Sequence, residues 1–236
     1  MPKREFALVI DVETCGDLKK PLVYDLGFAV IERRSGKIVE SASLVIGETF
    51  FAHADAMRTA YYADKLPIYR EGMANGKFVT VPMWVAWRKV RDVIRKYNIK
   101  RAYAYNMDFD QRALNHTIKI HSNGRYNSFL PAGIEYCCIM HMACQTILSQ
   151  RKYGIFARAN GFVSPAGNVR TTAEAAYAYI TNNPAYQEPH TGLEDVKIEI
   201  GIMQKCIRQK KRMVEKPRRD AWKIPQAKAR GQLQMA

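Results

Sequence analysis

The sequence predicts an α/β fold in which helices flank a mixed sheet, and three observations lead to this prediction. An apolar run at residues 6–10 has the length and composition of a central strand covered on both faces. Two more strand-like runs follow it across short turns. Beyond residue 83, amphipathic helical segments alternate with short apolar strands. The 236 residues are 47% hydrophobic, which suffices for one core.

Five strands are expected. The first three form an antiparallel meander, with Ser35-Gly36-Lys37 as the turn between the second and the third. In chain order, the five strands cover residues 6–10, 21–31, 38–46, 101–105 and 134–138.

Helices are expected between and after these strands. Trp84, Trp87, Val90, Ile94 and Tyr97 recur at intervals of three or four residues, which is typical of an amphipathic helix over 83–97. Other helices are expected at residues 52–63, 66–73, 109–120, 140–148, 171–180 and 193–207. A loop rich in Gly, Asn and Pro is expected from 154 to 168.

The charge indicates a polyanionic partner. The net charge is +15, and the segment from Lys205 to the end carries +9 of it. Such an end is an arm for nucleic acid, a docking segment for an acidic surface, or a solubilising tail. Pro217 and Pro225 interrupt a part that is poor in apolar residues, so we expect 208–236 to be a flexible tail outside a domain of residues 1–207.

The remaining composition excludes several classes of protein. No apolar run approaches the roughly 20 residues that a membrane span needs, and no secretion signal precedes the first strand. Five cysteines, an odd number, fit a reduced cytoplasmic setting. Cys137, Cys138, His141 and Cys144 lie in an apolar segment, so we interpret them as buried structural residues and not as a zinc site. For the aromatics between 50 and 69, core packing is favoured over base stacking.

The first motif with chemical meaning is Asp11-Val12-Glu13-Thr14-Cys15-Gly16. Strand alternation places Asp11 and Glu13 on the same face, at the carboxyl end of an apolar strand, where sites form in α/β sheets. Two adjacent carboxylates repel each other unless a cation binds between them. The alternative is a solvated strand end that leads into a turn.

The second motif is Asn106-Met107-Asp108-Phe109-Asp110, which opens a helix after a short strand. Asn106 is expected as the N-cap, which places Asp110 one turn into the helix. Asp108 is an alternative cap, and acids are common in first turns because they suit the helix dipole.

The third motif runs from His190 to Asp195. Thr191 and Glu194 have the spacing of a capping box, so His190 is expected in the loop just before the helix, with Asp195 one turn inside it. Four carboxylates and one histidine therefore fall at element ends. Such a set suits two Mg²⁺ or Mn²⁺ ions for an in-line displacement at phosphorus, with the histidine as general base.

In this order, the three motifs resemble those of the DnaQ-like (DEDDh) 3′→5′ exonucleases. The first resembles their Asp-x-Glu-Thr-x-Gly, the second their Asn-x-x-Phe-Asp and the third their His-x-x-x-x-Asp, over about residues 5 to 207. The resemblance implies an RNase H-like fold with a five-stranded mixed sheet. It also assigns the second catalytic acid to Asp110 and not to Asp108.

The resemblance further implies a role for each matching residue. Asp11, Glu13, Asp110 and Asp195 would hold two Mg²⁺ or Mn²⁺ ions, and His190 would be the general base. Thr14 and Cys15 would contact the terminal sugar through their backbone, and Asn106 would also contact substrate. The expected activity is release of nucleoside 5′-monophosphates from the 3′ end of single-stranded nucleic acid, with DNA favoured over RNA.

Several features depart from the family or stay open. Tyr105 stands where many members have His, and Cys15 where Thr is frequent. Residues 47–80 exceed what a minimal member needs, so we interpret them as an insertion that is either a substrate-shaping lid or extra packing. The alternative functions are a proofreading or repair subunit that works with a polymerase or repair partner, and a catalytically silent nucleic-acid-binding module. The oligomeric state is open, and a homodimer is one alternative.

Overall fold

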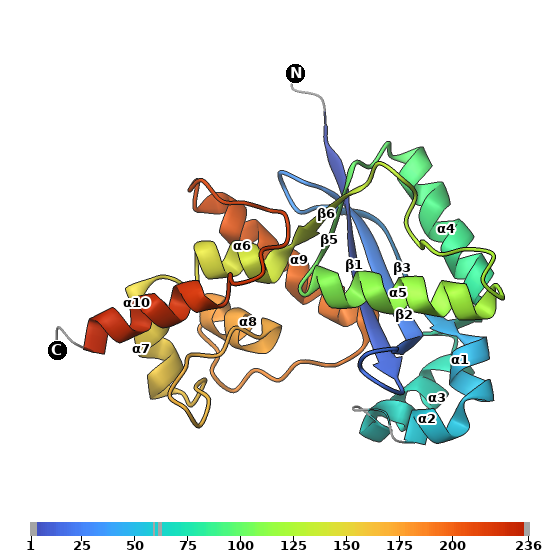
Figure 1. The fold of residues 1–236 in the computed structure, drawn as a ribbon, viewed down its shortest axis with the longest axis horizontal. Helices are drawn as coiled ribbons and strands as arrows, with labels where there is room; N and C mark the ends of the chain where they lie inside the picture. The colour runs from blue at the N-terminus through green and yellow to red at the C-terminus, as the bar shows by residue number, and fades with distance from the viewer. Residues whose placement is uncertain (1–3, 59, 61–62, 234–236) are drawn as a thin grey trace.

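The computed structural model describes residues 4–58, 60 and 63–233, and a mixed sheet lies at its centre (Figure 1). Its strand order is β4-β3-β2-β1-β5-β6. The strands are β1 (Phe6–Cys15), β2 (Leu22–Glu32), β3 (Ile38–Ile46), β4 (Val79–Val81), β5 (Arg101–Ala104) and β6 (Glu135–Cys138). The first three pair antiparallel, whereas β5 and β6 continue the sheet in parallel from β1. The predicted mixed α/β sheet is confirmed.

The sheet has six strands within the described residues, one more than expected. The additional strand, β4, pairs in parallel with the edge strand β3. It is three residues long and largely exposed, and Pro82 follows it as the N-cap of α4. Its sequence, Val79-Thr80-Val81, alternates, but three residues are too few for a pattern to distinguish a strand from a loop.

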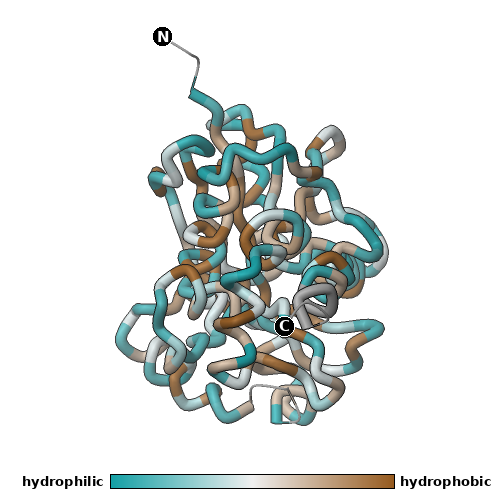
Figure 2. The backbone as a smooth tube through the Cα atoms, turned by 90° about the vertical axis from the view of Figure 1, so that its left-hand side faces the viewer, coloured by the Kyte–Doolittle hydropathy of each residue, from teal (hydrophilic) through white to brown (hydrophobic). Residues whose placement is uncertain are grey.

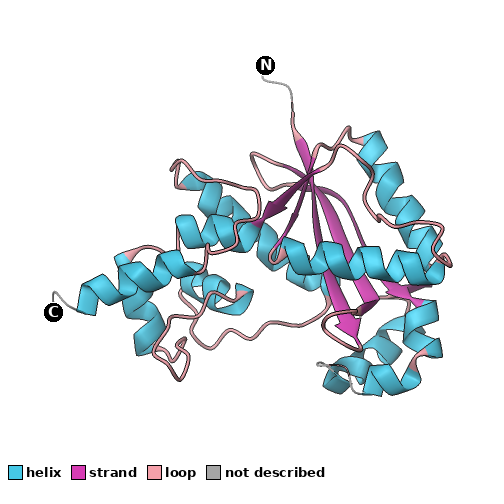
Figure 3. Cartoon of the chain, viewed as in Figure 1, coloured by secondary structure: helices cyan, strands magenta, loops and turns pink. Residues whose placement is uncertain are grey.

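Helices cover both faces of the sheet (Figure 3). They are α1 (Gly47–Ala52), α2 (Ala54–Arg58), the 3₁₀ helix η1 (Ala63–Lys65), α3 (Leu66–Ala74), α4 (Met83–Lys96), α5 (Met107–His121), α6 (Ile139–Gln145), α7 (Arg151–Ala159), α8 (Ala173–Thr181), α9 (Gly192–Arg208) and α10 (Lys223–Leu233). Alternate residues of β1 enter two cores. Leu8 and Ile10 pack with α4 and α5, whereas Ala7 and Val9 pack with α6 to α9. Figure 2 shows the backbone coloured by hydropathy, with hydrophobic and hydrophilic segments interspersed along the chain.

One loop prediction and one helix prediction were wrong in detail. The loop expected over 154–168 begins with most of helix α7, whose Tyr153 and Ala157 are buried in the core. The helix expected over 52–63 is instead divided between α1, which ends at the C-cap His53, and α2. Residues 59, 61 and 62 of that prediction lie outside the described residues.

Residues 47–80 contribute a small core of their own. Phe50, Tyr69 and Phe78 pack there with Tyr24 from β2, and all four side chains are buried. Of the aromatics between 50 and 69, Phe50 and Tyr69 therefore have the packing role that the sequence analysis favoured, whereas Phe51 is 63% exposed and Tyr61 and Tyr62 lie outside the described residues.

The C-terminal segment is packed on the domain, which corrects the expectation of a tail outside the core. Ala221 is buried in the main core, and helix α10 contacts α6 and α7. The Gln226 side chain accepts a hydrogen bond from the Val169 N–H at 2.9 Å and donates one to the Val169 carbonyl at 2.7 Å. Few apolar residues are needed to attach this segment, because its polar side chains form hydrogen bonds with the backbone of the domain. No helix among the described residues combines the length and apolar character needed to cross a membrane.

Candidate active site

A cavity of about 410 Å³ opens at the carboxyl ends of β1 and β5, and the three motifs meet in it. All five residues expected to be catalytic line it, namely Asp11, Glu13, Asp110, His190 and Asp195. Of the expected substrate-binding residues, Thr14 and Asn106 line it too. Cys15 does not: its side chain is 3% exposed and packs in the small core with Tyr24.

Strand alternation positions the first motif. Val12 points into the core beneath α4 and α5, so Asp11 and Glu13 share the opposite face and reach the cavity. The pairing register with β2 shifts between Glu13 and Thr14. Such an irregularity re-aims side chains at a strand end.

Helix α5 separates the two aspartates of the second motif. Asn106 is its N-cap, as predicted, but its side chain makes no capping hydrogen bond and lines the cavity instead. Asp110 is 4% exposed, and its carboxylate accepts hydrogen bonds from its own N–H and that of Val12. Asp108 is exposed and lines a neighbouring hollow. Of the two aspartates, Asp110 is therefore the one that lines the cavity.

The third motif enters α9 through a close backbone crossing. A Cβ built on Gly27 of β2 would lie 2.0 Å from the Gly192 carbonyl carbon, so only glycine fits there. Thr191 is the N-cap, but its side chain makes no capping hydrogen bond, so the predicted capping box does not form. His190 has a φ of +56°, in the left-handed region. The crossing brings His190 and Asp195 beside β1.

A buried carboxylate of β2 supports this crossing. Asp25 Oδ2 accepts hydrogen bonds from the Gly192 N–H at 2.9 Å and from the Tyr69 hydroxyl at 2.6 Å. Tyr69 belongs to α3, so the segment 47–80 contributes to the placement of the third motif.

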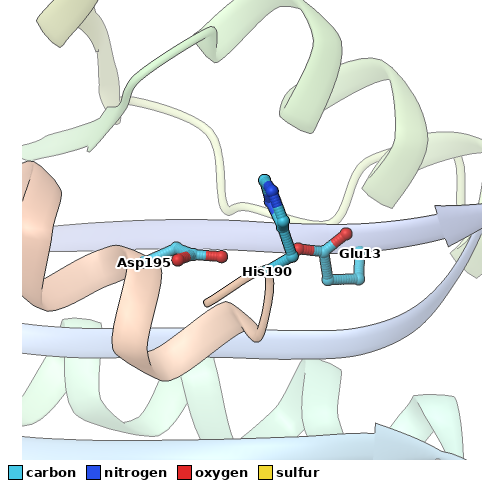
Figure 4. A group of neighbouring side chains, drawn as sticks. All are labelled: Glu13, His190 and Asp195. Carbon is cyan, nitrogen blue, oxygen red and sulfur yellow. The ribbon is translucent and has the colours of Figure 1, made fainter. Parts of the chain in front are cut away.

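Glu13, His190 and Asp195 form a compact group with the chemistry of a metal site (Figure 4). One ligand atom of each lies within 4.8 Å of the other two. Asp195 Oδ1 is buried and has no hydrogen-bond partner among the described residues. A buried carboxylate oxygen without a partner is costly, and a cation would stabilise it. The donor set therefore fits a divalent ion.

Burial is the main cause that disfavours the charged forms of these carboxylates, and neighbouring acids add to it for Asp11, Glu13 and Asp195. Burial raises the pKa of Asp110 to about 7 and, with a contribution from Glu188, that of Asp195 to about 8. The pKa of Asp11 is raised by burial and then by neighbouring acids, Glu199 first among them. Burial and Asp195 likewise raise the pKa of Glu13. Because no Lys or Arg belongs to the described lining, a bound cation is the natural counter-charge.

His190 has the opposite shift. Its pKa is lowered by burial and then by the positive charge of Lys65 in η1, while Asp64 acts weakly against both. The imidazole is therefore neutral at neutral pH and able to accept a proton.

Sequence reasoning missed two further acids of the cavity, Glu188 and Glu199. Glu199 follows Asp195 by four residues on α9, so helical periodicity places both on one face and was a usable signal. Glu188 lies in the loop before His190, where no periodic pattern marks it. Its pKa is raised to about 7, mainly by burial and then by Glu174.

Comparison with known proteins finds likeness in structure only. No family model and no curated protein matches the sequence. A 3′-exonuclease, whose structure concerns 3′-end specific recognition of a histone mRNA stem-loop, is 13% identical, with a TM-score of 0.54 over 93% of this chain and 89% of that one. Product-bound exonuclease I is 13% identical, with a TM-score of 0.53 over 87% of this chain and 44% of that one.

The zinc-bound complex of E. coli ExoI with single-stranded DNA is 12% identical, with a TM-score of 0.51 over 86% of this chain and 40% of that one. The chain thus spans less than half the length of either exonuclease I chain. It has the fold of these 3′-exonucleases, so the fold that the motif resemblance implied is confirmed.

Proposed function

We propose that this chain is a metal-dependent 3′→5′ exonuclease that hydrolyses the terminal phosphodiester bond of single-stranded nucleic acid. One observation carries the proposal: four carboxylates and one histidine, from three distant segments, line a single cavity whose described lining has no Lys or Arg. Such a set suits divalent cations and a phosphate-bearing substrate.

Two divalent cations, Mg²⁺ or Mn²⁺, would be held by Asp11, Glu13, Asp110 and Asp195. When bound, they polarise the attacking water and stabilise negative charge on the leaving oxygen. Carboxylate oxygens favour these hard ions over softer metals. The unpartnered oxygen of Asp195 supports this assignment.

His190 would accept the proton of the attacking water. Its lowered pKa keeps the ring neutral at neutral pH, as a general base requires. It belongs to the loop before α9, beside the rigidly placed Asp195 and Glu13. This neighbourhood would keep the base close to the reacting phosphate.

The terminal nucleotide would lie against Thr14 and Asn106, which line the cavity. Outside it, a hollow of about 650 Å³ on α5 is lined by Arg112, His116 and Lys119, among others. Arg112 Nη2 donates a hydrogen bond of 3.5 Å to the carbonyl of Leu18, a residue that lines the catalytic cavity. We propose that phosphates upstream of the 3′ end follow this basic path.

Release of mononucleotides from a single strand tests the proposal. The full chain is incubated with 3′-labelled DNA and RNA oligonucleotides of matched sequence, in Mg²⁺, in Mn²⁺ and in EDTA. Both polymers are included because one structurally similar protein is described with a histone mRNA stem-loop and another in complex with single-stranded DNA. We expect release with either ion and none in EDTA, and none from Asp11→Asn.

Equal release with and without EDTA would refute metal dependence. Binding of the strand without release in any buffer would instead indicate a silent binding module, or a subunit that needs a polymerase or repair partner.

A further inference from the structure

Glu199 is a buried acid of the cavity to which the proposed mechanism gives no role. It lies on α9, one turn beyond Asp195, and is 2% exposed. Its Oε1 accepts a hydrogen bond from the Tyr105 N–H at 3.0 Å. Its Oε2 is buried and has no hydrogen-bond partner among the described residues.

The surroundings of Glu199 offer no structural reason for a carboxylate. A buried acid is ordinarily stabilised by an ion pair or by hydrogen bonds to both oxygens, and here only one oxygen is bonded. A glutamine would serve the Tyr105 N–H equally well. The second oxygen is therefore the part of the side chain that calls for a partner.

The neighbours of Glu199 indicate what that partner is. Among the charged groups that raise the pKa of Asp11, Glu199 has the largest effect and Asp110 the next largest. The three carboxylates line the same cavity. Three acids in one wall without a cationic side chain are the usual environment of a divalent ion.

We propose that Glu199 is a further metal-binding residue, which helps Asp11 and Asp110 to hold one of the two divalent cations through Oε2, directly or through a water. The inference rests on the proposed function and adds a fifth carboxylate to its metal site. It divides the site into two parts. Glu13, Asp195 and the adjacent His190 form one part, and Asp11, Asp110 and Glu199 form the other.

Titration of Mn²⁺ into the full-length chain without nucleic acid tests this proposal. Glu199→Gln keeps the size of the side chain and the acceptor for the Tyr105 N–H. We expect it to bind one Mn²⁺ with roughly 10- to 100-fold lower affinity. Glu174→Gln is the matched control, because it makes the same substitution at a glutamate that does not line the cavity. Glu174 acts only at a distance, by raising the pKa of Glu188. The control should bind Mn²⁺ as the unaltered chain does.

A second variant separates the effect of side-chain length from the effect of charge. Glu199→Asp keeps the charge but withdraws the carboxylate by one methylene, so it should also weaken Mn²⁺ binding. Unaltered Mn²⁺ affinity and stoichiometry in both variants, in a chain that still releases nucleotides, would overturn the role of Glu199 alone. An unaltered chain that binds no Mn²⁺ would instead refute the proposed function itself.

Discussion

Asp108 and Asp110 have the same side chain and lie two residues apart, yet their environments are opposite. Asp110 is buried between the end of β1 and the first turn of α5, where backbone N–H groups bond to it. Asp108 points to solvent on the outer side of the same turn. Residue type alone left both as candidates, and the helical turn between them separates the two. The resemblance had already assigned the role to Asp110.

His190 permits the most direct test of an individual role. His190→Ala should lower turnover by about 10²- to 10⁴-fold, because it removes the proposed proton acceptor. Mn²⁺ should still bind, because the carboxylates stay in place. Single-turnover nucleotide release and Mn²⁺ titration measure the two effects separately. His53→Ala, at the C-cap of α1 and outside the cavity, is the control. Turnover that is unchanged in His190→Ala would exclude His190 from the mechanism.

Helix α9 depends on glycine for its position over the sheet. At its start, the Gly192 backbone lies against Gly27 of β2, where a side chain on either residue would overlap backbone atoms of the other. This close approach places Asp195 beside Glu13 of the neighbouring strand. The geometry of the site is therefore set by contact between two elements and not by the third motif alone.

Gly27→Ala should separate these elements. The added methyl group would lie 2.0 Å from the Gly192 carbonyl carbon, so α9 must shift, at a cost of about 1–3 kcal/mol in stability. We expect a lower melting temperature and weaker Mn²⁺ binding. Gly201→Ala, within α9, is the control, because its Cβ would lie 3.3 Å from the ring of Tyr177, which is able to move. Mn²⁺ binding as tight in Gly27→Ala as in the control would show that the crossing does not position the site.

Whether an element could be predicted from the sequence depends on its length and on whether its own residues or tertiary contacts stabilise it. The long strands β1 to β3 and the amphipathic helix α4 carry their pattern in their own residues, and the sequence predicts them. Strand β4 exists because three residues pair with the edge of β3. Helix α7 contains Gly154 in a segment rich in loop-forming residues, and packing of Tyr153 and Ala157 stabilises it. Tertiary contacts of this kind override local propensity.

At the scale of the whole molecule, sequence motifs predicted which residues meet but not what surrounds them. The five motif residues converge because three element ends meet at the carboxyl ends of the central strands β1 and β5. Glu188 and Glu199 enter the same cavity through the fold, without a motif. The packing of the C-terminal segment could not be predicted from the sequence either, because it depends on contacts between residues far apart in the chain. One example is the Glu215 carbonyl, which accepts a hydrogen bond from the Cys138 N–H at 2.8 Å.

The concentration of buried acid makes the stability of the whole molecule depend on pH and metal. In the folded chain the pKa of Asp110 is raised to about 7 and that of Asp195 to about 8, whereas an unfolded aspartate has a pKa of about 3.9. Between about pH 4 and 8 the metal-free folded state therefore holds more protons than the unfolded state. Its stability is lost as pH rises through these raised values.

We therefore expect the melting temperature in EDTA to fall from pH 6 to pH 8.5, and Mg²⁺ to reverse most of this fall, because the ion replaces the lost protons as counter-charge. Asp195→Asn, which has no carboxyl proton to lose at that position, should show a smaller fall in EDTA and a smaller gain with Mg²⁺. Differential scanning calorimetry at both pH values measures all four conditions. A melting temperature in EDTA that does not fall over this interval would contradict the prediction, because it would mean that these carboxyl groups lose no protons between pH 6 and pH 8.5 in the folded chain.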